Sequence, residues 1–172
     1  MSSVTLTQVG IDQVDQLLQI SKGTFIESYE HLNDPVDFQL YLEKAFNVQQ
    51  LTNELLDKQT SFYFLFWEQT LAAYIKLVDG VGKDSLLGEN HIYLERIYVQ
   101  SDFQGKGLGS HLINFVADKA RQQRRDGIWL TVWEENPDAI SWYHHKGFRR
   151  IGAHTFVVGN DPQTDHVMYL PV

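Results

Sequence analysis

The sequence contains no cysteine. Disulfide bonds, thiolate metal ligands and cysteine nucleophiles are therefore excluded together, so an enzyme with this sequence cannot form an acyl-cysteine intermediate. The absence says little about the cellular compartment, because a reducing cytosol does not require a chain without cysteine.

Long hydrophobic runs and long basic runs are also missing. No stretch of about 18 apolar residues occurs, and the N-terminus lacks the pattern of a signal peptide. The formal net charge is −8, and no long basic run occurs beyond the short RQQRR of residues 121–125. We therefore expect a cytoplasmic protein that binds neither nucleic acid nor a membrane. Its negative charge favours binding of a cationic small molecule. An acidic surface that only maintains solubility explains the charge equally well.

The chain of 172 residues is 43% hydrophobic, which is enough to bury one core. No linker, repeat or low-complexity tract divides it, so we expect a single domain over residues 1–172. Alternating hydrophobicity predicts strands at 3–9, 91–100 and 128–134, a hairpin over 61–80, and a last hairpin over 148–172 whose loop spans 160–164. Helical periodicity and caps predict helices at 12–32, 35–46, 48–58, from the loop at 105 to 126, and at 138–146. A loop is expected over 80–90. This mixed order predicts a central sheet with helices on both faces.

The segment 102–112, DFQGKGLGSHL, places Gly105, Gly107 and Gly109 between a predicted strand and a predicted helix. Such a loop exposes backbone N–H groups at a helix N-terminus, where phosphates bind. It is not a Walker A loop, because Lys106 is followed by glycine rather than serine or threonine. The G-x-G-x-G spacing in mid-chain also differs from the Rossmann fingerprint. The glycines alone fit a merely flexible start of a helix as well.

Two motifs, which follow one another along the chain in the family's order, resemble the signatures of the GCN5-related N-acetyltransferases (GNAT). The residues Gln104 to Gly109 follow the strand LERIYV and fit the family's Q/R-x-x-G-x-G/A loop, and ENPDAISWYHHKGF is similar to its second signature. The segments GTFIESYE, YLEKAFNVQQL, GAHTF and QTDHVM resemble bacterial spermidine/spermine N-acetyltransferases in particular. The resemblance implies an α/β GNAT fold with a mixed, mostly antiparallel sheet of about seven strands. It also implies acetyl-CoA as co-substrate and a primary amine, that of a polyamine, as acceptor.

The resemblance also implies which residues hold the cofactor. The backbone of Ile97, Tyr98 and Val99 would pair with the pantetheine arm, and one of its N–H groups would polarise the thioester carbonyl. The residues that would wrap the pyrophosphate are Gln104, Gly105, Lys106, Gly107, Leu108, Gly109 and Ser110. Asn136 would bind the cofactor as well as cap its helix, and Lys146 is assigned to the cofactor too.

Acetyl transfer to an amine requires a deprotonated amine and a proton for the leaving thiolate. Without cysteine, direct attack by the amine in a ternary complex is the simplest route. Tyr143 stands where the family places the tyrosine that protonates the thiolate, although a merely buried aromatic would fit there as well. Glu95 is our first choice for the base, because strand alternation predicts that it shares a face with Ile97. A salt bridge beside Arg96 is the alternative role for this glutamate.

Carboxylates and aromatic faces suit a cationic acceptor. We expect its pocket to be formed by Glu27, Tyr29, Glu30, Trp133 and Glu134. No metal site is expected, because the adjacent His144 and His145 point about 100° apart on a helix. The sequence leaves open an amino acid, an aminoglycoside or a protein amine as acceptor, a CoA-binding regulatory module without turnover, and a homodimer.

Overall fold

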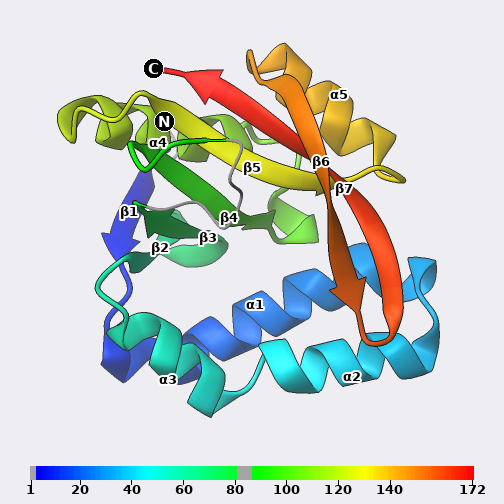
Figure 1. Cartoon of the computed structure of the whole chain (residues 1–172). Helices are drawn as coiled ribbons and strands as arrows, with labels where there is room; N and C mark the ends of the chain where they lie inside the picture. The colour runs from blue at the N-terminus through cyan, green and yellow to red at the C-terminus, as the bar shows by residue number, and fades with distance from the viewer. Residues whose placement is uncertain (1–2, 81–86) are drawn as a thin grey trace.

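The computed structural model describes residues 3–80 and 87–172, so most of the loop expected over 80–90 lies outside the described residues. It contains a seven-stranded sheet with helices on both faces (Figure 1), as the sequence predicts. The strands are β1 (Val4–Gln8), β2 (Thr60–Trp67), β3 (Thr70–Asp79), β4 (His91–Val99), β5 (Gly127–Trp133), β6 (Arg149–Val158) and β7 (Asp161–Pro171). The helices are α1 (Val14–Tyr29), α2 (Pro35–Ala45), α3 (Val48–Leu56), α4 (Leu108–Gln122) and α5 (Pro137–His145). The strand order is β1-β2-β3-β4-β5-β7-β6, and within the described residues every neighbouring pair is antiparallel except β4 and β5.

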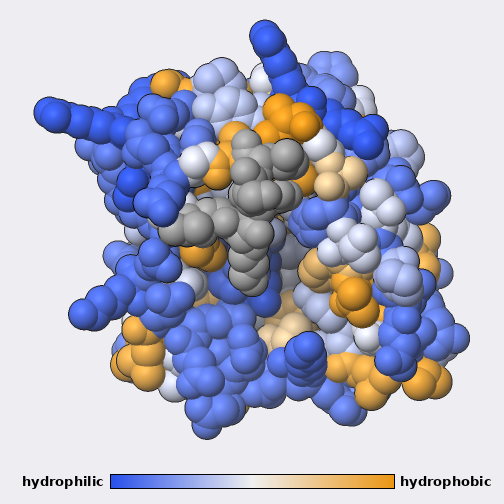
Figure 2. Space-filling view, viewed as in Figure 1, coloured by the Kyte–Doolittle hydropathy of each residue, from blue (hydrophilic) through white to orange (hydrophobic). Residues whose placement is uncertain are grey.

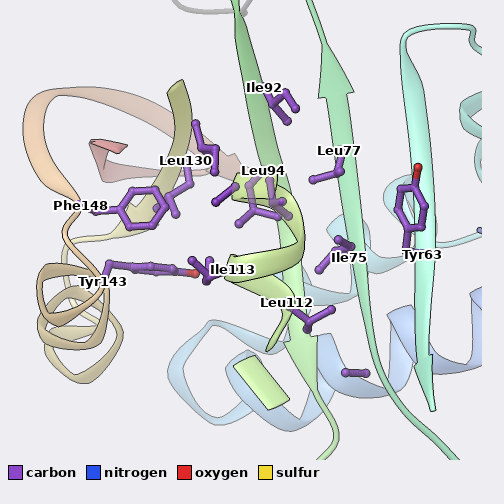
Figure 3. Packing of buried hydrophobic residues seen from close by; sticks show 14 of the residues in the cluster. Tyr63, Ile75, Leu77, Ile92, Leu94, Leu112, Ile113, Leu130, Tyr143 and Phe148 are labelled. Atoms are coloured by element: carbon purple, nitrogen blue, oxygen red, sulfur yellow. The ribbon is translucent and has the colours of Figure 1, made fainter. Parts of the chain in front are cut away.

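Helices α1, α2 and α3 lie on one face of the sheet, while α4 and α5 lie on the other (Figure 1). On the α4 face, apolar side chains of β3, β4 and β5 pack with Leu112 and Ile113 of α4 and with Tyr143 of α5 (Figure 3). On the α1 face, the aromatic strand β2 buries Phe62 and Phe64 against α1 and α3. Figure 2 shows one outer face, where hydrophilic residues dominate and apolar residues form small separate groups. No helix among the described residues is long and apolar enough to cross a membrane.

The helix caps follow the sequence closely. The Asp34 carboxylate accepts hydrogen bonds from the backbone N–H groups of Val36 and Asp37, and Pro35 begins α2. Asn47 caps α3 and Asn136 caps α5 through their side-chain oxygens. Each cap satisfies N–H groups that have no acceptor within the first helical turn. These hydrogen bonds are local in sequence, so the starts of α2, α3 and α5 do not depend on tertiary contacts.

The last hairpin is tighter than expected. Residues 160–164 were predicted to form a loop, but Val158 pairs with Asp161, so β7 begins at Asp161. Gly159 adopts a left-handed conformation, with φ of 61°, and allows a two-residue turn. The run of turn-forming residues therefore marks the turn and also the first residues of the strand after it.

A bulge interrupts β4 at Glu95. Lys76 of β3 pairs with Arg96 and the next residue, Leu77, pairs with Leu94, so Glu95 is the extra residue. The prediction that Glu95 shares a face with Ile97 is therefore wrong. The side chain of Ile97 packs on the α4 face, whereas the Glu95 carboxylate contacts Lys76, which lies over the Phe62 ring on the α1 face.

Four charged side chains form a buried network beside this bulge. The Lys76 Nζ lies 3.0 Å from the Glu54 carboxylate and 2.7 Å from that of Glu95. The Arg96 guanidinium lies 3.4 Å from Glu54 and 4.9 Å from the centre of the Phe46 ring. Two cations and two carboxylates therefore balance one another, and they connect α3 to β3 and β4.

Candidate active site

The parallel strands β4 and β5 separate at the centre of the sheet. They pair only at His91 with Gly127, Ile92 with Ile128, and Tyr93 with Trp129 among the described residues. Beyond Tyr93 the strands diverge, and a cavity opens on each side of the gap. The separation therefore creates a site in the middle of an otherwise continuous sheet.

We call the first cavity the glycine groove. Its lining consists of Ile97, Val99, Phe103, Gln104, Gly105, Gly107, Leu108, Gly109, Ser110, Asn136, Ala139, Trp142 and Tyr143. We call the second cavity the aromatic pocket. Its lining consists of Phe25, Tyr29, Asn33, Tyr41, Tyr93, Leu94, Glu95, Arg96, Ile97, Tyr98, Thr131, Val132, Trp133, Asn136, Ala139, Tyr143, Phe156, Val158, Gln163 and Asp165. The two cavities share Ile97, Asn136, Ala139 and Tyr143, which therefore mark the point where they meet.

Backbone geometry shapes the glycine groove. Gly105 and Gly107 have φ of 76° and 78°, a left-handed conformation that glycine adopts without strain. Gly109 leaves room for Trp142, since a Cβ atom there would lie 3.0 Å from the indole ring. Helix α4 begins at Leu108, so its first N–H groups have no helical acceptor and point into the loop. This arrangement suits a bound pyrophosphate.

Most of the residues predicted to hold the cofactor line this groove. Those that do are Ile97, Val99, Gln104, Gly105, Gly107, Leu108, Gly109, Ser110 and Asn136. The side chain of Tyr98 instead lines the aromatic pocket. Neither Lys106 nor Lys146 lines the groove. Lys106 is exposed, and the Nζ atom of Lys146 lies 5.6 Å from the centre of the Trp142 ring. The Asn136 side-chain oxygen accepts a hydrogen bond from the backbone N–H of Ala139 and caps α5, so the predicted cap is confirmed.

Tyr143 occupies the junction of the two cavities. Its side chain extends from α5 toward Ile113 and is 9% exposed, with its ring 5.6 Å from that of Phe148 (Figure 3). Burial raises the pKa of the Tyr143 phenol, so the hydroxyl keeps its proton at neutral pH. A neutral phenol at this point can donate a proton to a group bound in either cavity.

Aromatic rings form much of the aromatic pocket. The ring centre of Tyr29 lies 6.3 Å from that of Tyr98 and 6.5 Å from that of Trp133, both in edge-on contact. Burial raises the pKa of Tyr29, and interactions with the side chains of Tyr98 and Asn136 oppose that rise. Burial raises the pKa of Tyr41, on the wall of the pocket, to about 12. The tyrosines are therefore neutral, and they present ring faces and hydroxyl groups rather than charges.

Two of the five residues predicted for the acceptor pocket, Tyr29 and Trp133, line the aromatic pocket. Glu27, Glu30 and Glu134 are exposed and do not line it. Glu27 is two residues before Tyr29 and so points to the other side of α1, while Glu30 and Glu134 follow the ends of α1 and β5.

The carboxylate that sequence reasoning missed is Asp165 on β7. It is 7% exposed and lines the aromatic pocket, opposite Trp133 of β5. The only sequence signal was an acidic residue just before the apolar end of the final strand. Among the described residues, no group of three or more histidine, aspartate or glutamate side chains could hold a metal ion.

Comparison with known proteins identifies the class. The model of the acetyltransferase (GNAT) family matches residues 14–148, and the chain therefore belongs to this family. It is 34% identical, over 98% of its length and 97% of the relative, to an uncharacterized N-acetyltransferase in the pepI 3′ region of Lactobacillus delbrueckii subsp. lactis.

Solved structures show the same fold. PaiA N-acetyltransferase from Thermoplasma acidophilum, in complex with coenzyme A, is similar with a TM-score of 0.79 at 18% identity, over 99% of both chains. The spermidine N-acetyltransferase from Vibrio cholerae, in complex with CoA and spermine, is similar with a TM-score of 0.71 at 19% identity, over 98% of this chain and 95% of that one. The chain is thus an acetyl-CoA-dependent N-acetyltransferase, and acetyl-CoA is the co-substrate of its family.

We expect Gly107→Ala to weaken CoA binding by roughly 5- to 30-fold, because a side chain in the left-handed conformation costs about 1–2 kcal/mol. Isothermal titration calorimetry with CoA measures the effect. Gly107→Asn should lose less, because asparagine tolerates this conformation better. Gly88→Ala is the matched control, since Gly88 has no left-handed φ and a Cβ there meets open space. An unchanged Kd in Gly107→Ala would contradict the role assigned to the loop.

Proposed function

We propose that this protein acetylates a primary amine of a polyamine. The observation that carries the proposal is the aromatic pocket, in which ring faces surround a buried carboxylate beside the junction with the glycine groove. Alkylammonium groups bind favourably to ring faces and to carboxylates. The fold likeness to an enzyme crystallised with spermine is consistent with this acceptor.

The chemistry proposed at the junction is a direct transfer. The amine nitrogen forms a bond to the acetyl carbon while the bond from that carbon to the CoA sulfur breaks. A backbone N–H of the segment 97–99 stabilises the developing oxyanion, and Tyr143 donates its proton to the leaving thiolate. Glu95 lines the pocket, and we assign it to receive one ammonium proton, directly or through water, while the proton that the nitrogen loses on forming the amide returns to Tyr143. Its ion pair with Lys76 fixes its position.

Thiol release from acetyl-CoA tests this function. The assay is clean, because the protein has no cysteine that would react with the thiol reagent. We expect kcat/KM for spermidine or spermine to exceed that for lysine and for an aminoglycoside by at least about tenfold, the ratio given by one additional charged contact. A preference for another amine would contradict the polyamine acceptor. Tight CoA binding without turnover of any amine would instead indicate a CoA-binding regulatory module.

A further inference from the structure

Asp165 differs from the other charged groups that line the aromatic pocket. Glu95 and Arg96 belong to the network with Lys76 and Glu54, whose charges balance one another. No lysine or arginine in the described part of the chain forms an ion pair with Asp165. The fixed cations near the pocket are therefore already matched by other carboxylates.

The groups around Asp165 stabilise its charge only in part. Thr131 on β5 and His154, its partner in the pairing of β6 with β7, both act to lower the pKa of Asp165. The charge of Glu134 acts in the opposite direction. Histidine is a weaker and pH-dependent counter-charge compared with lysine or arginine. The net effect is that burial raises the pKa of Asp165.

A buried carboxylate of this kind is costly unless a cation joins it. Trp133 lies opposite Asp165 across the pairing of β5 with β7, and the Tyr29 ring is in contact with Trp133. A cation beside Asp165 would therefore also meet aromatic faces. Asp165 and Tyr143 line the same pocket from different elements, β7 and α5.

We propose that Asp165 binds a second ammonium group of the acceptor, one that is not acetylated, and so determines the preference for diamines and polyamines. This assignment rests on the proposed function and adds the residue that selects the substrate. The reacting amine lies at the junction with the glycine groove, and the second ammonium group lies against Asp165. An amine with one charge lacks the group that Asp165 recognises.

The experiment compares two substrates of matched length, 1,4-diaminobutane and 1-aminobutane, in the native protein and in Asp165→Asn. Asparagine keeps the size of the side chain but removes the charge. We expect kcat/KM for the diamine to fall about 10- to 150-fold more than kcat/KM for the monoamine, as for the loss of a charged hydrogen bond. Most of this loss should be in KM, because the second ammonium group is bound equally in the ground state and the transition state.

Two controls separate recognition from folding. Glu135→Gln removes an exposed carboxylate near the pocket and should leave the ratio of the two substrates unchanged. The pKa of Asp165 is higher in the folded protein than in the unfolded chain. The native state therefore loses stability as the pH rises from the unfolded pKa through the folded pKa, because ionisation is less favourable in the folded protein. Asp165→Asn should therefore be at least as stable as the native protein at pH 8, as measured by thermal unfolding.

The outcomes distinguish this inference from the proposed function. A native protein that does not prefer the diamine over the monoamine contradicts the role of Asp165, while turnover of spermidine or spermine in the thiol-release assay decides the proposed function separately. A native preference that survives in Asp165→Asn contradicts the role of Asp165 alone. Equal losses for the two amines would also overturn it, because they would show that Asp165 acts on the transfer step and not on the second charge.

Discussion

Replacement of Tyr143 by phenylalanine should reduce kcat for acetyl transfer by at least about 100-fold, the usual contribution of a general acid. The phenol lies at the junction of the glycine groove and the aromatic pocket, and burial keeps its proton in place at neutral pH. Phenylalanine preserves the ring contacts with Trp142 and Phe148. The Kd for CoA should therefore change little.

Steady-state thiol release and calorimetric titration with CoA measure these two quantities separately. Tyr169→Phe is the matched control, because it removes a hydroxyl that donates to the Asp126 carbonyl at 3.1 Å, outside both cavities. Its kcat should equal that of the native protein. If Tyr143→Phe retained its kcat, the proton for the thiolate would have to come from another group or from water.

Replacement of Lys76 by methionine should lower the free energy of unfolding by about 3–5 kcal/mol, as expected when one partner of a buried ion pair is removed. Lys76 is 5% exposed and contacts both Glu54 and Glu95. Its loss leaves two carboxylates in the buried network with Arg96 as their remaining cation. The bulge of β4 should loosen with it, because Glu95 is the bulged residue.

Urea unfolding measures the change in stability. Arg121→Ala provides the contrast, since its ion pair with Asp118 is exposed and should contribute no more than about 1 kcal/mol. The double variant Lys76→Met, Glu95→Gln should recover part of the loss, because it restores a balance of one cation, Arg96, with one carboxylate, Glu54. A loss below about 1 kcal/mol in Lys76→Met would show that water reaches the network.

The sequence predicted the parts of the site that depend on local backbone geometry. The loop with Gly105 and Gly107 and the Asn136 cap use conformations and hydrogen bonds that neighbouring residues determine. The bulge at Glu95 could not be predicted in this way, because it depends on how β4 pairs with β3. Simple alternation therefore placed the Glu95 side chain on the wrong face.

The aromatic pocket was the less predictable part, because its residues come from distant segments. Acidic residues near the expected motifs, such as Glu27 and Glu134, are exposed. Asp165 enters the pocket through the pairing of β7 between β5 and β6, which periodicity alone does not reveal. The helices and strands could be read from the sequence, while the order of strands within the sheet required the structure.

The separation of β4 from β5 also bears on how such an enzyme can diversify. Beyond Tyr93, the edge of β4 that faces β5 has no strand partner in the described chain, so its main-chain groups remain available to the amides of a pantetheine arm. Main-chain groups are common to all residues, whereas the aromatic pocket presents individual side chains. Because the two cavities share only four residues, substitutions across most of the pocket can select a new acceptor while the cofactor and the chemistry are inherited unchanged.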